Sequence, residues 1–349
     1  MSTNPVLSIV IAVRNDNYGG DFTQRLQRGL DWNTRWLEHF RIRSEFVLVN
    51  WNPIKENPPI QEQIDWQAGL KYVSCRILEV SAEHHQHYLD QNLRDPVPMF
   101  EFLAKNVGVR RAMGEYVLCI NADIMVHRSI FRLIAANRLE KMAYYRANRL
   151  DFEAGITSTE TQMIQAGSFV SLKGRMYEFR PGLNKELQYQ YFMFRNNLRL
   201  QWEFWKLRNS GFCNRFSISV IYDNGDQVAH CLNSGDFMLM HRSHWLRLKG
   251  YSEYVFSAVH TDAIFTMLAH SQVKDVVFDR PILHQHHERR YSWNDMANDA
   301  RFAQTYQLLK EIAKVVREDQ PVERYLNDDE WGLGGHDLPE ITINDGSDG

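Results

Sequence analysis

The sequence predicts a Rossmann-like α/β fold, with a mixed, mainly parallel central sheet flanked by helices and a mostly helical insert. Short apolar runs rich in β-branched residues alternate in the first half with segments of helical periodicity. The runs end in polar loops, such as 14–20 after the run 7–13. The chain has 349 residues, 44% of them hydrophobic, which is enough for a substantial core. Such alternation is typical of parallel strands joined by right-handed helical crossovers.

The first half contains four predicted strands. They lie at 7–13, 45–50, 73–80 and 116–120. Apolar residues at helical spacing predict helices over 22–40 and 102–113, and Gly114 ends the second. Ligands of such sheets bind at the carboxyl ends of strands. The loops after the first, second and fourth strands are therefore expected to line one cleft.

The second half resumes this alternation after an interruption. Strand signals lie at 234–240 and 275–283, and helix signals lie at 241–249, 261–270 and 301–318. The chain is thus expected to have four parts: an α/β half (1–150), an aromatic, mostly helical insert (151–232), a second half of the same domain (233–317) and an acidic tail (318–349). The end of the tail, beyond Asp337, is rich in glycine and aspartate and is expected to be loose.

The charge of the chain is small and uneven. The formal net charge of −3 gives no argument for nucleic acid as a partner. Residues 318–349 carry ten acidic residues and one arginine, which leaves residues 1–317 with a net charge of +6. A basic body suits a phosphate-bearing ligand, and it is equally consistent with ordinary surface charge.

Cysteine usage and hydropathy indicate a cytoplasmic protein. The four cysteines are scattered and include no CxxC pair, which disfavours a disulfide framework or a structural zinc site. The start of the chain lacks the pattern of a secretion signal, and no apolar run is long enough to span a membrane. The segment 185–208 has five basic and two acidic residues among many aromatics. It is expected either to pack on the sheet domain or to make peripheral contact with a membrane.

Four groups of side chains could carry chemistry. One is a set of basic residues, Arg14, Lys105, Arg110 and Arg111, which could neutralise phosphate charge or simply lie at the surface. Asp123 directly follows the strand 116–120, where a carboxylate can hold Mg²⁺ or Mn²⁺ against a pyrophosphate or simply form a turn. The tract 284–290 contains three histidines, which suit a metal site or a solvated surface. Asp262 follows His260 at the start of a predicted helix, where it could act as a general base or as an N-cap.

Other chemistries lack their signatures. The sequence has no GxSxG elbow, no GxxxxGK[ST] phosphate loop, no GxGxxG fingerprint and no HExxH motif. The histidines at positions 84, 85 and 87 are therefore expected to lie in a solvent-exposed loop.

The order of the motifs resembles that of GT-A fold glycosyltransferases of the family 2 type. The stretch 106–123, NVGVRRAMGEYVLCINAD, resembles that family's pattern N-x-G-x-x-x-A-x-G-E-Y, four apolar residues and N-x-D. The stretch 234–253, SGDFMLMHRSHWLRLKGYSE, resembles its acceptor-side segment, in which GDF leads to a glycine, an aromatic residue and a glutamate. The resemblance covers about 1–150 and 230–290.

The resemblance implies a nucleotide-sugar site built from the strand ends. The residues implied are Val13, Arg14, Asp16, Asn50, Asn52, Lys105, Asn106, Asn121, Ala122 and Asp123. Val13, Arg14 and Asp16 would border the nucleoside, and the two asparagines after the second strand would lie near the base or ribose. Residues 121–123 would replace the family's DxD element. Asn121 stands where that element has its first aspartate, which puts the strength of metal binding in doubt.

The resemblance also implies the catalytic groups. Asp123 would bind Mn²⁺ or Mg²⁺ together with His284 or His287, and Asp262 would be the base, with Glu253 as the alternative. Gly235, Asp236 and His260 would lie on the acceptor side.

The implied activity is transfer of a sugar from a nucleotide diphosphate-sugar of the UDP or GDP type to a hydroxyl of a glycan or glycolipid. A single carboxylate base favours direct displacement with inversion. The alternative is a catalytically silent relative that binds nucleotide or glycan as a scaffold. A nucleotidyltransferase is disfavoured because the loop 17–20 lacks a glycine-rich phosphate-binding motif with a following Lys or Arg.

Overall fold

The computed structural model describes most of the chain outside the insert. The described residues are 4–91, 97–152, 169–172, 175–178, 180, 182–184, 187–188, 191, 194–195, 198, 220–223, 226–230, 235–254, 260–285, 287 and 300–343. Among them, no helix has the length and apolar character needed to cross a membrane.

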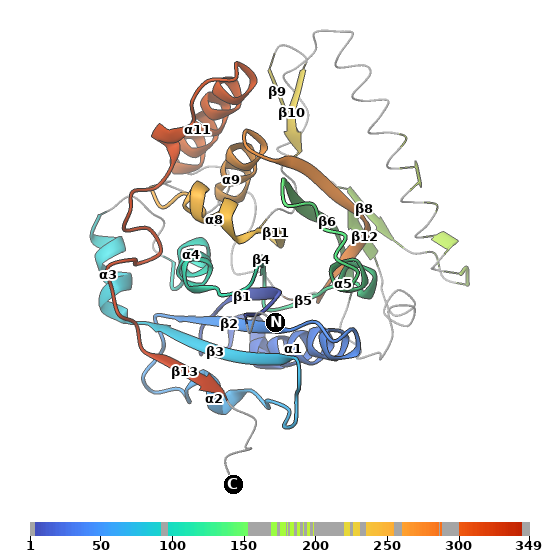
Figure 1. The fold of residues 1–349 in the computed structure, drawn as a ribbon, viewed down its shortest axis with the longest axis vertical. Helices are drawn as coiled ribbons and strands as arrows, with labels where there is room; N and C mark the ends of the chain where they lie inside the picture. Colours follow the sequence, from blue (N-terminus) through green and yellow to red (C-terminus); the bar gives the residue numbers. More distant parts are fainter. Residues whose placement is uncertain are drawn as a thin grey trace.

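A nine-stranded sheet runs through the molecule in the order β13-β3-β2-β1-β4-β11-β6-β12-β5 (Figure 1). Its strands are β1 (Leu7–Val13), β2 (Ser44–Trp51), β3 (Val73–Val80), β4 (Tyr116–Ile120), β5 (Ile124–Met125), β6 (Ala143–Phe152), β11 (Phe237–His241), β12 (Lys274–Gln285) and β13 (Glu340–Ile343). Strands β3, β2, β1, β4, β6 and β12 run one way, whereas β13, β11 and β5 run the other way. The strand order confirms the predicted fold class, a mixed and mainly parallel sheet.

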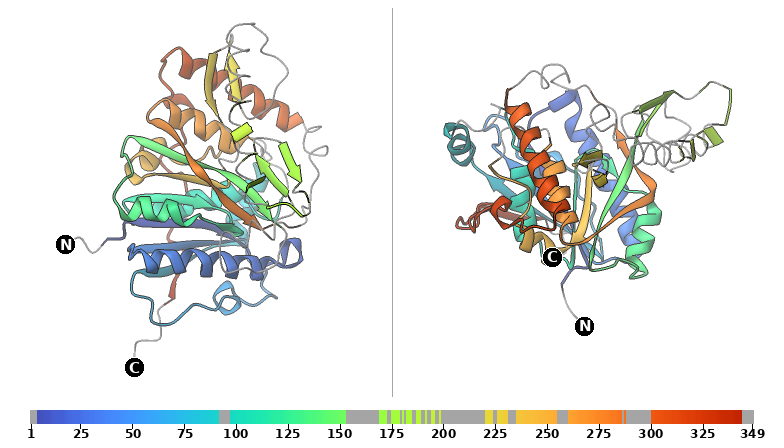
Figure 2. Two further views of the ribbon diagram at one scale, coloured as in Figure 1. Left: turned by 90° about the vertical axis from the view of Figure 1, so that its right-hand side faces the viewer. Right: turned by 90° about the horizontal axis from the view of Figure 1, so that it is seen from above.

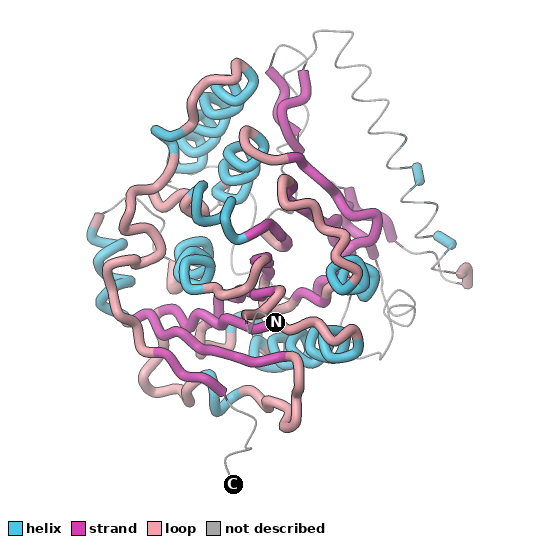
Figure 3. The backbone as a smooth tube through the Cα atoms, in the orientation of Figure 1, coloured by secondary structure: helices cyan, strands magenta, loops and turns pink. Residues whose placement is uncertain are grey.

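Helices cover both faces of this sheet (Figures 1 and 2). The main ones on these faces are α1 (Phe22–His39), α4 (Glu101–Arg111), α5 (Arg128–Ala135), α8 (Arg242–Leu248), α9 (Thr261–His270) and α11 (Ala300–Arg317). Helices α1 and α5 share one buried apolar cluster with the sheet, and α4, α8, α9 and α11 share the other. Figure 3 shows the same layering with the strands between the helices. The other helical elements are η1 (Tyr18–Gly20), α2 (Ile60–Gln63), α3 (Ala82–Asp90) and η2 (Glu323–Tyr325).

Helix α1 lies close against the chain segment that follows β4. The spacing of its apolar residues, including Leu26 and Leu30, buries one face as the sequence predicted. A methyl group on Gly29 would lie 2.7 Å from the carbonyl oxygen of Ala122, so only glycine permits this approach. Trp32 and Asn33 donate hydrogen bonds to the carbonyl oxygens of residues 126 and 124. The helix thereby fixes the backbone on both sides of Asp123.

Several predicted elements have the observed bounds, but the prediction of a solvent-exposed loop around the histidines at 84, 85 and 87 was wrong. Strands β1, β3 and β4 and helix α9 begin and end where the sequence predicted. Residues 82–90 form helix α3 instead of a loop, and the Ser81 side chain caps it. His85 is buried, and its Nδ1 accepts a hydrogen bond of 3.0 Å from Trp51. Packing against an aromatic side chain of β2 therefore outweighed the polar composition of this segment.

The described part of the insert contains strands that the sequence analysis did not predict. Strand β7 (Phe169–Leu172) pairs with β8 (Arg175–Glu178), and β9 (Val220–Asp223) pairs with β10 (Asp226–His230), both antiparallel. Residues 187–188, 191, 194–195 and 198 are helical. Most of the predicted helical segment 185–208 lies outside the described residues.

The C-terminal tail packs against the domain up to residue 343, so the expectation of a loose end was wrong there. Strand β13 pairs antiparallel with β3 at the edge of the sheet. Trp331 and Leu333 belong to the buried core. Arg110 and Arg111 at the end of α4 donate hydrogen bonds to backbone carbonyls between residues 329 and 336. Long-range pairing thus orders a segment whose own composition predicts no structure.

A buried network of charged side chains joins the amino-terminal ends of β1 and β2 to β3 and β13. Glu45 is fully buried, and its Oε1 accepts hydrogen bonds from Ser8 Oγ at 2.5 Å and from the Met113 backbone at 2.7 Å. Its Oε2 accepts one from Arg76 at 2.9 Å. Arg76 also pairs with Glu340 of β13 at 3.0 Å. Both oxygens of this carboxylate are therefore satisfied.

Candidate functional site

The loops that follow β1 and β2 are tied together at the carboxyl ends of their strands. Arg14 Nε donates to the carbonyl oxygen of Asn52 at 2.8 Å, and Arg14 also pairs with Asp16 at 2.6 Å. Asn50 is 2% exposed, and its Oδ1 has no hydrogen-bond partner among the described residues. The Val13 side chain is fully buried, so only its backbone can border a ligand.

Asp123 is the centre of a buried cluster at the end of β4. Its Oδ2 lies 3.2 Å from His287 Nε2 and 3.5 Å from His284 Nε2. The three side chains offer one ligand atom each, all within 4.8 Å of one another. The structure thus brings together the residues that the resemblance implied for a metal, because the antiparallel pairing of β12 with β5 carries the histidines to Asp123.

The donor set of this cluster fits a divalent metal. Asp123 Oδ1 is buried and has no hydrogen-bond partner among the described residues, so one carboxylate oxygen is left for a ligand. One carboxylate and two imidazoles suit Mn²⁺ better than Mg²⁺, because Mg²⁺ prefers oxygen ligands only. Burial alone would raise the pKa of Asp123, but His284, His287 and Arg25 lower that pKa well below its ordinary value. The carboxylate is therefore ionised at pH 7.

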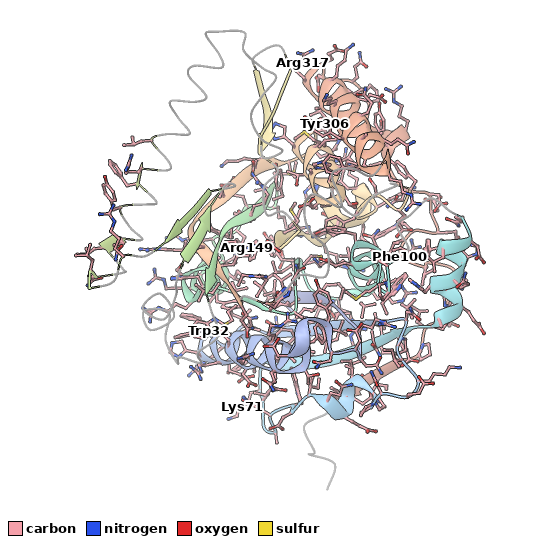
Figure 4. The ribbon with its side chains drawn as sticks, turned by 180° about the vertical axis from the view of Figure 1, so that it is seen from behind. Trp32, Lys71, Phe100, Arg149, Tyr306 and Arg317 are labelled. Carbon is pink, nitrogen blue, oxygen red and sulfur yellow. The ribbon has the colours of Figure 1, made fainter. Side chains whose placement is uncertain are left out.

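Asn121, two residues earlier, faces a different set of partners. Its Oδ1 accepts a hydrogen bond of 2.5 Å from the buried Lys105 Nζ, and its Nδ2 donates to Asp236 at 3.1 Å. Asp236 in turn pairs with Arg149 of β6, labelled in Figure 4, at 2.9 Å. Asn121 Oδ1 is thus engaged by an ammonium group. Among the side chains of the segment 121–123, it is Asp123 that keeps a carboxylate oxygen without a partner among the described residues.

Asp262 lies at the amino terminus of α9, in contact with the loop before β11. Its Oδ2 accepts a hydrogen bond of 2.9 Å from the Gly235 backbone, and the carbonyl oxygen of Gly235 accepts one of 2.8 Å from Lys105. Asp262 is only partly buried. Lys105 and Gly235 therefore connect the candidate base to Asn121, in the segment that contains Asp123.

His260 lies beside Asp262 in the chain but packs away into the core. Its ring lies 4.8 Å from that of Phe302 and 5.4 Å from that of Tyr306, both on α11. Figure 4 labels Tyr306 on this helix. Burial lowers the pKa of His260 to about 4, so the side chain is neutral at pH 7.

Glu253 and Asn106 contact each other rather than the Asp123 cluster. Asn106 is fully buried and donates to Glu253 Oε1 at 2.8 Å and to the Tyr251 carbonyl at 2.7 Å. Glu253 Oε1 also accepts from the backbone of Gly332 at 2.8 Å. These bonds position the carboxylate against the C-terminal segment, at the edge of a cavity of about 560 Å³ that α3 also lines.

Arg25 is the member of the cluster that sequence reasoning missed. Its Nη1 donates to Asp123 Oδ2 at 3.0 Å, and only 2% of its side chain is exposed. Its position inside a predicted amphipathic helix gave no reason to single it out. The one available signal was the pairing of Asp21 with Arg25 at i, i+4 spacing.

Comparisons with known proteins give a likeness of fold. No protein-family model matches the chain, and no curated protein sequence matches it. Its structure is similar to the GT-A glycosyltransferases TarS and GalNAc-T7. For S. aureus TarS residues 1–349 the identity is 12% and the TM-score 0.44, over 90% of this chain and 69% of that one. For GalNAc-T7 with UDP, GalNAc and Mn²⁺ the values are 11% and 0.47, over 89% of this chain and 48% of that one. The chain thus spans about half the length of the GalNAc-T7 chain.

Proposed function

We propose that this protein is a metal-dependent glycosyltransferase that uses a nucleotide diphosphate-sugar donor of the UDP or GDP type. The observation that carries the proposal is the cluster of Asp123, His284 and His287 at the carboxyl end of β4. A buried carboxylate with one unpartnered oxygen and two imidazoles suits Mn²⁺, and this edge of an open α/β sheet is where ligands bind.

In this proposal the strand-end loops hold the donor. The side chains of Arg14, Asp16, Asn50 and Asn52 border the nucleoside. A bound Mn²⁺ supplies positive charge beside the diphosphate as it leaves. Lys105 is fully buried and donates to Asn121 and Gly235, so it fixes the segment that lies between the two halves of the site.

Asp262 is the proposed base. As the acceptor oxygen bonds to the anomeric carbon, Asp262 takes the hydroxyl proton, and the electron pair of the breaking bond leaves with the diphosphate. The backbone N–H of Gly235 orients Asp262 Oδ2 for this step. Glu253 is the weaker candidate because its hydrogen bonds hold it against Asn106 and the C-terminal segment, whereas Asp262 is linked through Gly235 and Lys105 to the segment 121–123. One base and direct displacement favour inversion at the anomeric carbon.

A thermal-shift panel tests this proposal. UDP, GDP, CDP and dTDP and their common sugar conjugates are each added with and without Mn²⁺. We expect one diphosphate class to raise the melting temperature only with Mn²⁺, because a ligand that binds only the folded state stabilises it. Asp123→Asn should abolish the Mn²⁺-dependent rise, whereas Asp329→Asn, on an exposed carboxylate, should keep it.

Two outcomes would contradict the proposal in different ways. If no diphosphate raises the melting temperature, the proposed donor site is wrong. Binding without release of sugar from any donor would favour the alternative, a silent nucleotide- or glycan-binding scaffold.

We further propose that the acceptor is a glycan or glycolipid met at the cytoplasmic face of a membrane. Leu187, Tyr191, Phe194 and Leu198 are 49–68% exposed, and their spacing covers about 60° of helical arc. Such an apolar stripe in a basic segment suits an anionic lipid surface. The wild-type protein should co-sediment with vesicles containing anionic lipid, whereas the Phe194→Glu variant should stay in the supernatant. Equal sedimentation of both proteins would exclude this contact.

A further inference from the structure

A buried guanidinium lies inside the candidate metal cluster. Arg25 Nη1 approaches the same oxygen of Asp123, Oδ2, that both histidines approach. Its Nε donates to Asp21 at 2.7 Å, and its Nη2 donates to the carbonyl oxygen of Tyr18 at 2.5 Å. Three hydrogen bonds therefore fix the guanidinium against Asp123.

With both histidines neutral, as metal ligands must be, the charges of this cluster balance before any ligand enters. Arginine is always protonated, so Arg25 contributes +1 and the ionised Asp123 contributes −1. Asp21 is shared with Arg28, which pairs with it at 3.2 Å. A divalent cation adds two positive charges beside a buried guanidinium, where salt screens little. The single carboxylate cannot offset both cations, whereas a diphosphate brings the missing negative charge.

We propose that Arg25 makes metal binding conditional on the diphosphate. Its charge weakens the affinity of the cluster for the free ion and leaves the affinity for the metal–diphosphate pair high, so the two ligands bind cooperatively. This inference rests on the proposed function for the identity of the second ligand. By linkage, Mn²⁺ increases the affinity for UDP by the same factor by which UDP increases the affinity for Mn²⁺.

The test measures Mn²⁺ binding directly, without turnover. Electron paramagnetic resonance counts free Mn²⁺ during titration of the protein, alone and with saturating UDP or GDP. Arg25→Gln keeps a polar side chain of similar length and removes the charge. We expect it to bind free Mn²⁺ about ten-fold more tightly and to lose a similar factor of cooperativity, which is within the ordinary range of coupling between ligands.

Two further variants control for charge and for structure. Arg28→Gln removes the same charge from the same helix, but Arg28 pairs with Asp21 and forms no ion pair with Asp123 among the described residues, so this variant should behave as the wild type. Asp21→Asn removes a counter-ion of Arg25 and should weaken free Mn²⁺ binding, which keeps the inference testable if Arg25→Gln does not fold.

The outcomes separate this inference from the proposed function. Unchanged or weaker binding of free Mn²⁺ by Arg25→Gln would overturn the role of Arg25, even with normal binding of Mn²⁺ and UDP together in the wild type. A wild type that binds Mn²⁺ but no nucleotide would overturn the proposed function, and the free-metal titration would still decide the effect of Arg25. Tighter free Mn²⁺ binding by Arg28→Gln would assign the effect to general surface charge and overturn the inference.

Discussion

Two buried carboxylates lie at opposite ends of the parallel strands, and each contacts an arginine. They differ in how completely their oxygens are hydrogen-bonded. At the amino-terminal end, Glu45 has partners on both oxygens, from Ser8, Met113 and Arg76. At the carboxyl end, Asp123 Oδ1 has no partner among the described residues. A saturated carboxylate of this kind stabilises a fold, whereas an incomplete one leaves room for a ligand. The comparison predicts that substitutions at the two ends affect different measurements.

The largest expected effect is on turnover at the carboxyl end. Asp262→Asn should lower kcat by about 10²–10⁴-fold, because the amide cannot accept the acceptor proton. Its free energy of unfolding should fall by only about 1 kcal/mol, since the amide can keep one of the two backbone hydrogen bonds. Single-turnover assays with saturating donor measure the first quantity and urea unfolding the second. Undiminished turnover would exclude Asp262 as the base.

Glu45→Gln should do the reverse. Removing one partner of a buried ion pair leaves the charge of Arg76 less compensated and costs about 3–5 kcal/mol of stability. Binding of Mn²⁺ and diphosphate should remain as in the wild type under conditions where the variant is folded. Urea unfolding measures the loss of stability, and the thermal-shift panel measures the binding of Mn²⁺ and diphosphate. A loss below 1 kcal/mol would show that the network at this end is dispensable and break the comparison.

His260 limits the comparison, because its Nε2 is also buried without a partner among the described residues. Its surroundings are aromatic rings, so the consequence should be pH-dependent stability and not ligand binding. The folded pKa of about 4 lies below the ordinary value of 6.5, so the unfolded chain binds the proton more readily. The free energy of unfolding therefore keeps the full contribution of neutral His260 above about pH 6.5 and falls by about 3 kcal/mol as the pH drops to 4.

His260→Asn should flatten this acid dependence. Asparagine tolerates the positive φ of 74° that His260 adopts. Urea unfolding at pH 7, 5.5 and 4.5 should give a smaller decline for the variant than for the wild type. Parallel declines would show that the titration of His260 does not contribute.

The smallest loss of stability is expected for Glu340→Gln. This variant tests how much burial adds to the energy of an ion pair within one network. Glu340 pairs with the same Arg76 as Glu45, but 38% of its side chain is exposed. Its loss should cost about 0.2–1 kcal/mol. A cost equal to that of Glu45→Gln would mean that the pairing partner, and not burial, sets the energy.

The sequence predicted those parts of the fold that depend on local pattern. Strands β1 and β4 are mainly apolar runs, and β3 is rich in apolar residues although Arg76 and Glu79 interrupt it. Helix α9 follows a polar start with mainly apolar residues. Helix α3 and strand β13 were missed because contacts from distant segments hold them: Trp51 for His85 in α3, and the edge of β3 for β13. The pattern within either segment carries no sign of those partners.

The candidate site divides in the same way. The motif around Asp123 and the histidine tract could be read from the sequence, and the structure brings them within bonding distance. Arg25 and Arg149 could not be read, because a single arginine in a helix or strand has the same appearance whether it faces solvent or a carboxylate. Whether these residues act as proposed depends on the measurements above.

The pairing of β13 with β3 has a consequence for synthesis on the ribosome. The ion pair that joins these strands links residues 264 positions apart in the chain. At ordinary translation rates the β3 edge would wait about 10–50 s for its last partner to be made. During that interval the nascent sheet exposes an unpaired strand edge, the feature through which chains add to one another. We therefore expect chaperone demand during expression to be concentrated on this edge, and a chain truncated before residue 340 to aggregate more readily than the full one.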